Sequence, residues 1–214
     1  MDVVVIDPGH GGRQTVGGSS PNNAVGPAGT LEKDLTLDIA LRAAPLLVDH
    51  GLRCVLTRDT DENLGLSARA RVAREQRATA FVSIHFNGFN RRAQGTETFV
   101  HAGSTPPSTT LARLVQQFML DATLLADRGV KRARFGVLAP ASHHPSTAAC
   151  LVEVSFMDVP EEEQRLANPS YRQGIAEALA AAVSEFVRGA SFQLPAEVAM
   201  EAPEPEDGYE LIVR

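Results

Sequence analysis

The sequence predicts an α/β fold: a twisted, mostly parallel or mixed central sheet of about six strands with helices on both faces. Short apolar runs bounded by turn residues alternate with segments whose apolar residues recur at helical spacing, which is typical of a sheet covered on both sides. The chain has 214 residues, of which 43% are hydrophobic, enough for one sizeable core. We therefore expect a single domain.

Six segments are predicted to be strands because they are short, apolar and often β-branched. In the fourth of them the residues alternate, with Glu97 and Phe99 on one face. In the sixth, Glu153 lies within an otherwise apolar run. The segments cover residues 3–6, 52–57, 80–84, 95–101, 135–138 and 148–154.

Four segments show the apolar spacing of helices: residues 31–50, 66–77, 111–125 and 169–188. Thr30 is expected to cap the first helix, and Pro45 to kink or shorten it. Thr109 or Thr110 is expected to cap the third, and Asn168 precedes the fourth. The arginines of the second helix are interpreted as a solvated face.

Acidic charge is concentrated at the C-terminus. Residues 190–214 carry six acidic side chains against one arginine, whereas the remaining 189 residues carry 20 against 19 lysines and arginines. The nearly neutral body lacks the basic surface that a phosphate backbone requires, which argues against nucleic acid as a partner. We assign residues 1–189 to the main domain and 190–214 to an acidic, Pro-rich tail that acts as a linker or adds an edge strand.

Signals for membrane insertion, disulfide bonding and export are weak in this sequence. No apolar run reaches the length of a membrane span. Cys54 and Cys150 lie in apolar runs and are expected to be free, buried thiols. The chain opens directly with the first strand and shows no signal-peptide pattern, so the sequence does not indicate an export route.

Four side chains with metal-binding or acid–base chemistry lie where predicted elements begin or end. His10 follows the first strand after an Asp-Pro-Gly turn, and His85 follows the third. Glu32 lies in the first turn of a helix. Two imidazoles and a carboxylate are the ligands of a hydrolytic zinc ion that keeps one position open. Glu153 suits the carboxylate that moves protons without binding the metal, because burying an acid is costly without a role or a partner.

Each of these residues also has a structural interpretation. A histidine after a strand is often a packing residue, and the helix dipole alone favours Glu32. Glu153 would be satisfied by a buried ion pair with an arginine, and His143 and His144, in a polar loop, are expected to face solvent. Spacing alone does not choose between these roles and a metal site.

Several short motifs occur along the chain in a characteristic order, from residue 2 to about residue 188. They resemble those of the zinc-dependent N-acetylmuramoyl-L-alanine amidases, the type 3 amidase family of bacterial and phage cell-wall hydrolases. The segments are Ile6-Asp7-Pro8-Gly9-His10-Gly11-Gly12, Leu31-Glu32-Lys33-Asp34-Leu35, Thr57-Arg58-Asp59-Thr60-Asp61, Ser83-Ile84-His85-Phe86-Asn87, Arg128-Gly129-Val130-Lys131 and Leu151-Val152-Glu153-Val154-Ser155-Phe156.

The resemblance implies a Zn²⁺ ion held by His10, Glu32 and His85, with Glu153 as the catalytic acid and base. It implies peptidoglycan as substrate, cut between the lactyl group of N-acetylmuramic acid and L-alanine, and action at the bacterial cell wall. Two alternatives stay open. One is a non-catalytic peptidoglycan-binding module on the same fold, and the other a zinc peptidase or deacetylase acting on a different amide. Protein partners and oligomeric state leave no signal in the sequence.

The chain also departs from the pattern of the family it resembles. Ser155 replaces a usual glycine, Phe86 a small residue, Arg74 an asparagine, and residues 157–159 a Leu-Ser-Asn sequence. We expect all but Arg74 to reshape the groove. Some relatives carry a helical insertion that covers the zinc. Here only ten residues separate Val100 from Leu111, so we expect an open site. The glycines around His10 are expected to leave room for a bulky glycan.

Overall fold

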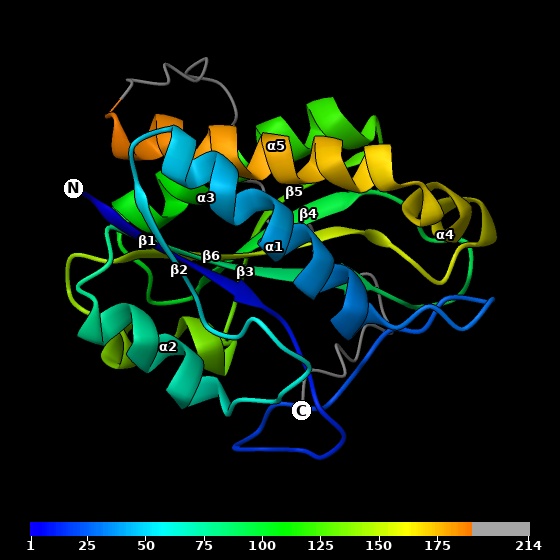
Figure 1. The fold of residues 1–214 in the computed structure, drawn as a ribbon, viewed down its shortest axis with the longest axis horizontal. Coiled ribbons are helices and arrows are strands. Elements are labelled where there is room, and N and C mark those ends of the chain that lie inside the picture. The colour runs from blue at the N-terminus through cyan, green and yellow to red at the C-terminus, as the bar shows by residue number, and fades with distance from the viewer. Residues whose placement is uncertain (190–214) are drawn as a thin grey trace.

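Six strands form one mixed sheet in the computed structural model, which describes residues 1–189 (Figure 1). Their order across the sheet is β2-β1-β3-β6-β4-β5. The first four of these run parallel, β4 is antiparallel to β6, and β5 is parallel to β4. The predicted mixed α/β sheet is confirmed. The strands are β1 (Val3–Pro8), β2 (Arg53–Leu56), β3 (Ala80–Asn87), β4 (Thr96–His101), β5 (Asp127–Ala133) and β6 (Ala148–Phe156).

Helices cover both faces of the sheet (Figure 1). One face carries the three long helices α1 (Glu32–Asp49), α3 (Pro106–Thr123) and α5 (Pro169–Val187). The opposite face carries α2 (Leu66–Glu75) and two short 3₁₀ turns, η1 (Gly136–Leu138) and η2 (Pro140–Ser142). A short helix, α4 (Pro160–Ala167), leads into α5.

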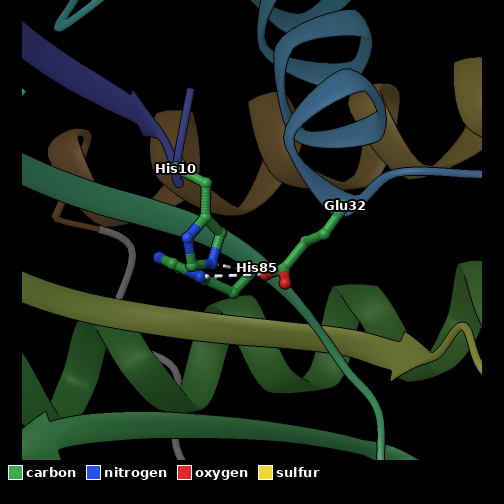
Figure 2. Close-up of side chains that lie close together, drawn as sticks. All are labelled: His10, Glu32 and His85. Atoms are coloured by element: carbon green, nitrogen blue, oxygen red, sulfur yellow. Dashed lines mark hydrogen bonds and ion pairs between the residues drawn. The ribbon is translucent and has the colours of Figure 1, made fainter. Parts of the chain in front are cut away.

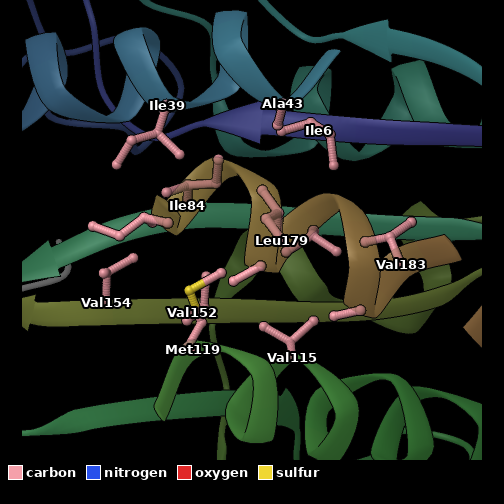
Figure 3. Packing of buried hydrophobic residues seen from close by; sticks show 14 of the residues in the cluster. Ile6, Ile39, Ala43, Ile84, Val115, Met119, Val152, Val154, Leu179 and Val183 are labelled. Atoms are coloured by element: carbon pink, nitrogen blue, oxygen red, sulfur yellow. The ribbon is translucent and has the colours of Figure 1, made fainter. Parts of the chain in front are cut away.

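The alternation of side chains along the strands divides the core in two. Ile6, Ile84 and Val152 point toward the three long helices and form the larger cluster, as Figure 3 shows. Their neighbours Val5 and Leu151 point to the opposite face, where they pack with residues of α2 and η1. The second cluster is smaller, which leaves part of that face available for a site.

Helix α1 begins and continues differently from the prediction. Leu31, not Thr30, is its N-cap residue, and it makes no side-chain capping hydrogen bond. The helix does not end at Pro45 but continues to Asp49. Pro45 has no backbone N–H, so the helix lacks the hydrogen bond to the carbonyl of Leu41. Because both residues are on the exposed side, that carbonyl can accept a hydrogen bond from water instead.

Helix α3 begins earlier than predicted. Thr109 and Thr110 lie inside it, because Pro106 and Pro107 occupy its first turn. Proline is well suited to that turn, where a backbone N–H would have no partner within the helix. Residues 102–105 alone connect β4 to α3, which leaves no room for a covering helix at this point.

Two elements near the edge of the sheet differ from the sequence interpretation. Residues 135–138, predicted to be a strand, contain the 3₁₀ turn η1. The strand is β5 instead, and its charged, half-buried residues conceal the apolar pattern that identifies buried strands. Helix α4 was not predicted, because its first turn is mostly acidic and does not show apolar spacing.

Three further sequence interpretations can be compared with the structure. Cys54 and Cys150 are free, as expected, and Cys150 is fully buried. Among residues 1–189, no helix combines the length and the apolar character that crossing a membrane requires. The predicted acidic tail, with its edge strand, lies outside the described residues, so the boundary at residue 189 remains a prediction.

The core between the sheet and α5 predicts a large effect for Leu179→Ala. Leu179 is fully buried in the cluster of Figure 3, so its truncation should lower the free energy of unfolding by about 2–5 kcal/mol. Leu41→Ala on the exposed side of α1 is the control, with an expected change within about 0.5 kcal/mol. Urea denaturation measures both. Equal effects would contradict this description of the core.

Candidate metal centre

His10 lies just beyond β1 in a left-handed backbone conformation, with φ of 61°. Its Nδ1 is 3.1 Å from the carbonyl oxygen of Ser20 and 3.0 Å from the Ser20 hydroxyl. Because a carbonyl oxygen only accepts, Nδ1 carries the proton and donates it. The lone pair of Nε2 is then left to face the interior of the site.

Glu32 is the first residue of α1, and its carboxylate reaches both histidines from the side of this helix (Figure 2). Its Oε1 is 3.1 Å from His10 Nε2 and 3.1 Å from His85 Nδ1. The backbone N–H of Phe86 also donates to Oε1 at 3.0 Å, and that of Ala24 donates to Oε2 at 2.8 Å. The carboxylate is therefore fixed in place from the N-terminal loop and from β3.

The structure brings together the three side chains that the sequence analysis singled out as metal ligands. One ligand atom each from His10, Glu32 and His85 lies within 4.8 Å of the others, and the two imidazole rings meet edge to face at 4.9 Å. His10 Nε2 is buried and makes no hydrogen bond of acceptable geometry with any described residue, although it lies close to Glu32. A buried lone pair aimed at a carboxylate is the arrangement expected of a metal ligand.

The electrostatics of the cluster favour an ionised carboxylate. Burial opposes ionisation of Glu32, but the nearby imidazole of His10 and the hydrogen bond from His85 outweigh it and lower the pKa of Glu32. Burial likewise opposes the charged form of His10, yet Glu32 raises the pKa of His10. For His85 burial dominates and lowers the pKa, which favours the neutral imidazole that metals bind.

Glu153 lies directly beside His85, because β6 pairs with β3 in the register that places the two residues opposite each other. The side chain is 4% exposed, and its Oε2 has no hydrogen-bond partner among residues 1–189. Burial, with the nearby charges of Glu32 and Glu97, raises the pKa of Glu153 well above its usual range. A buried carboxyl without a partner, next to a cluster of ligands, is suited to exchanging protons with a substrate.

Glu97 is a further buried acid of the site, whose role the sequence analysis did not recognise. It lies opposite Glu153 across the β4–β6 pair. Its carboxylate accepts hydrogen bonds from Asn87 Nδ2 at 2.8 Å, Arg128 Nε at 2.9 Å and Lys131 Nζ at 2.6 Å. Burial opposes ionisation, but the two cations lower the pKa of Glu97. The sequence signal for this role was the alternation of residues 95–101, which places Glu97 on the same inward face as Phe99.

A cleft opens beside these groups on the α2 face of the sheet. Its lining includes the ionisable residues His10, His85, Glu153 and Arg134. It also includes the apolar residues Leu66, Phe135, Val137 and Leu151. The site therefore has access to ligands, and a bound molecule would meet both an apolar wall and the ionisable cluster.

The glycines around His10 make room for the protein itself rather than for a substrate. A Cβ atom on Gly9 would collide with the His85 ring, and one on Gly11 would collide with the carbonyl oxygen of Glu62. The expectation that these positions are kept small for a bulky glycan is thus not supported. Gly9 allows the second histidine to lie against the loop that carries the first.

Two interpretations of solvent exposure are wrong. Arg69 on α2 is 1% exposed and lies under the His10 loop, so the arginines of this helix are not all on a solvated face. His143 is 4% exposed: its Nε2 lies 2.8 Å from the carbonyl of Val137, and its ring packs against Phe81. The contacts of Arg69 with the His10 loop and of His143 with Phe81 join segments far apart in the sequence, which local patterns do not reveal.

Comparison with known proteins identifies the family. A family model described as N-acetylmuramoyl-L-alanine amidase matches residues 4–185. The chain belongs to this family. Of its relatives, the amidase CwlM of Bacillus licheniformis is 32% identical over 82% of this chain and 65% of its own length. The amidase AmiA of Escherichia coli is 31% identical over 86% of this chain and 75% of its own length.

Solved structures of this amidase family share the fold. The amidase AmiC2 of Nostoc punctiforme superposes with a TM-score of 0.76 at 36% identity, covering 87% of this chain and 97% of that one. An amidase from Clostridium difficile gives a TM-score of 0.79 at 30% identity, covering 88% and 98%. The described residues therefore correspond to nearly the whole of two amidase structures.

The contact between Gly9 and the His85 ring predicts that Gly9→Ala disturbs the site. The added methyl group must displace the imidazole or the loop, and overpacking of this kind costs about 1–3 kcal/mol of unfolding free energy. Gly174→Ala in α5, where a Cβ would meet no atom within 4 Å, should instead stabilise by about 0.5–1 kcal/mol. Denaturant unfolding of both variants tests this, and a neutral Gly9→Ala would refute the packing argument.

Proposed function

We propose that this chain is a zinc-dependent amidase of peptidoglycan, which hydrolyses the bond between the lactyl group of N-acetylmuramic acid and L-alanine. The observation that carries the proposal is the grouping of His10, Glu32 and His85 beside the unpartnered Glu153, at the edge of an accessible cleft. Membership of the amidase family supports the reaction and the substrate class. The enzyme would therefore act outside the cytoplasm, at the bacterial cell wall.

The residues present fit a zinc ion. Two imidazoles and one carboxylate are a common ligand set of catalytic zinc, which keeps a further coordination position for water or substrate. The hydrogen bond from His10 Nδ1 to the Ser20 carbonyl fixes the tautomer that presents Nε2, as is usual around metal-bound histidines. Apart from its contact with His85, Glu32 accepts hydrogen bonds from backbone N–H groups of two separate segments, which hold the third ligand without a charged competitor.

The reaction requires one proton to be moved twice. When bound, zinc would supply Lewis-acid activation of the scissile carbonyl and of the attacking water. Glu153, as a carboxylate, accepts the proton of that water and then donates it to the nitrogen of the leaving amine. Its raised pKa favours the first step, because a carboxylate whose conjugate acid has a higher pKa is a stronger base toward water.

Digestion of purified peptidoglycan tests the substrate and the reaction. The protein should bind about one zinc ion per chain, as a site with three protein ligands implies. Mass spectrometry of the products should show glycan freed of its peptides and new L-alanine amino termini. Zinc binding without digestion would favour a binding module, and cleavage of a different amide would favour a peptidase or deacetylase. A chain that binds no zinc would contradict the proposal.

Replacement of Glu153 by glutamine should separate metal binding from turnover. Zinc content should be unchanged, whereas kcat should fall by roughly 10²–10⁴-fold, because the amide cannot accept the water's proton. In the wild type, kcat/KM should decrease as pH falls through the raised pKa of Glu153, since the base must be ionised. Glu177→Gln on the exposed side of α5 is the matched control. Retention of activity by Glu153→Gln would reassign the base.

A further inference from the structure

The segment that carries His10 adopts a conformation that it would not prefer in isolation. His10 has φ of 61°, and the glycines that follow it have φ of 130° and 64°. A non-glycine residue in the left-handed region is strained and persists only where its surroundings determine it fully. The carbonyl groups on the strand side of this turn must therefore be held by other parts of the chain.

Arg69 of α2 holds two of these carbonyls. Its Nη1 donates to the Pro8 carbonyl at 2.6 Å and to Asp7 Oδ1 at 2.8 Å, and its Nη2 donates to the His10 carbonyl at 2.6 Å. Its Nε donates to the Leu64 carbonyl at 2.9 Å. With 1% exposure, the guanidinium is committed to this loop and cannot serve as a surface charge.

Arg58, in the loop after β2, binds the carbonyl groups of this turn from the other side. Its Nε donates to the Pro8 carbonyl at 3.0 Å, and its Nη2 donates to the carbonyls of Gly9 at 2.9 Å and Lys33 at 2.8 Å. Lys33 follows Glu32, so this guanidinium links the segment of the first ligand to the helix of the second. The hydroxyl of Thr36 adds a further hydrogen bond to the Gly9 carbonyl at 2.9 Å.

We propose that Arg69 and Arg58 are positioning residues that preassemble the metal site. Together they hold three successive carbonyls, those of Pro8, Gly9 and His10, so that the His10 ring already faces Glu32 and His85 when an ion arrives. The planar fork of a guanidinium is needed, because an ammonium group cannot direct several donors at fixed angles. The proposal rests on the proposed function only in taking zinc as the ion.

The competing explanation is that both arginines merely support the fold. A purely supporting role would lower the melting temperature of the metal-free protein and leave the zinc affinity of the folded fraction unchanged. A positioning role would weaken zinc binding even in variants that remain folded. Zinc affinity and thermal stability of the metal-free protein must therefore be measured on the same samples.

The test uses Arg69→Lys and Arg58→Lys, which keep the charge and lose the fork, and Thr36→Val, which replaces the hydroxyl with a methyl group of similar size. Zinc affinity is obtained by competition with a chromophoric chelator, with zinc alone as the probe, on protein whose folding is checked by circular dichroism. Each lysine variant should bind zinc roughly 10–100-fold more weakly, the range typical for partners of metal ligands, and Thr36→Val should lose less. Arg71→Lys, on the same helix but 67% exposed, is the control and should bind like the wild type.

The outcomes separate this proposal from the proposed function. If the wild type binds no zinc, the proposed function fails, whatever the variants do. If the wild type binds zinc and the folded lysine variants bind it equally well, the positioning role is overturned. If one lysine variant does not fold, the other decides by the same criterion. If neither folds, the arginines support the whole fold, and the proposal is overturned as well.

Discussion

The alternation of side chains along β1, β3 and β6 is the constraint on which the rest of the structure depends. One set of alternate residues is apolar to the ends of the strands and packs beneath α1, α3 and α5. The other set starts apolar but becomes polar toward the carboxyl ends, where Asp7, Ser83, His85 and Glu153 lie on one face. The parallel pairing places these ends side by side, so the site is a consequence of the sheet and its register.

Buried charges on this face are compensated in a selective way. Asp7 is fully buried but accepts hydrogen bonds from Arg69, Thr57 and Ser83, which outweigh the effect of burial and lower its pKa. Glu97 is compensated by Arg128 and Lys131. Glu153 alone among these acids has an oxygen without a partner in the described residues. Isolated buried charge is costly, and the group left uncompensated is the one whose protonation must change during the proposed reaction.

The sequence predicted best what depends on local pattern. Apolar or alternating runs located five of the six strands, all but β5. Residues that follow two of these strands, His10 and His85, and one at the start of a helix, Glu32, were candidate ligands, and the structure groups them together. Prediction from the sequence failed where contacts with residues far along the chain determine the local structure. β5 is stabilised by pairing with β4 despite its charges, and Arg69 is buried because carbonyls of β1 need donors. Neither need is visible in the residues around them.

The same face-by-face argument limits which departures from the family pattern can affect the substrate. Phe86 and Met157 are buried in the cluster beneath the long helices, on the side of the sheet away from the cleft, so the expectation that they reshape the groove is not supported. Ser155, two residues beyond Glu153, is on the cleft face. Asp158 accepts hydrogen bonds from the N–H groups of Phe89 and Arg91, and so sets the loop that follows β3. That loop follows the strand that carries His85, so a change at Asp158 would act on this loop, whereas the side chain of Phe86 belongs to the core.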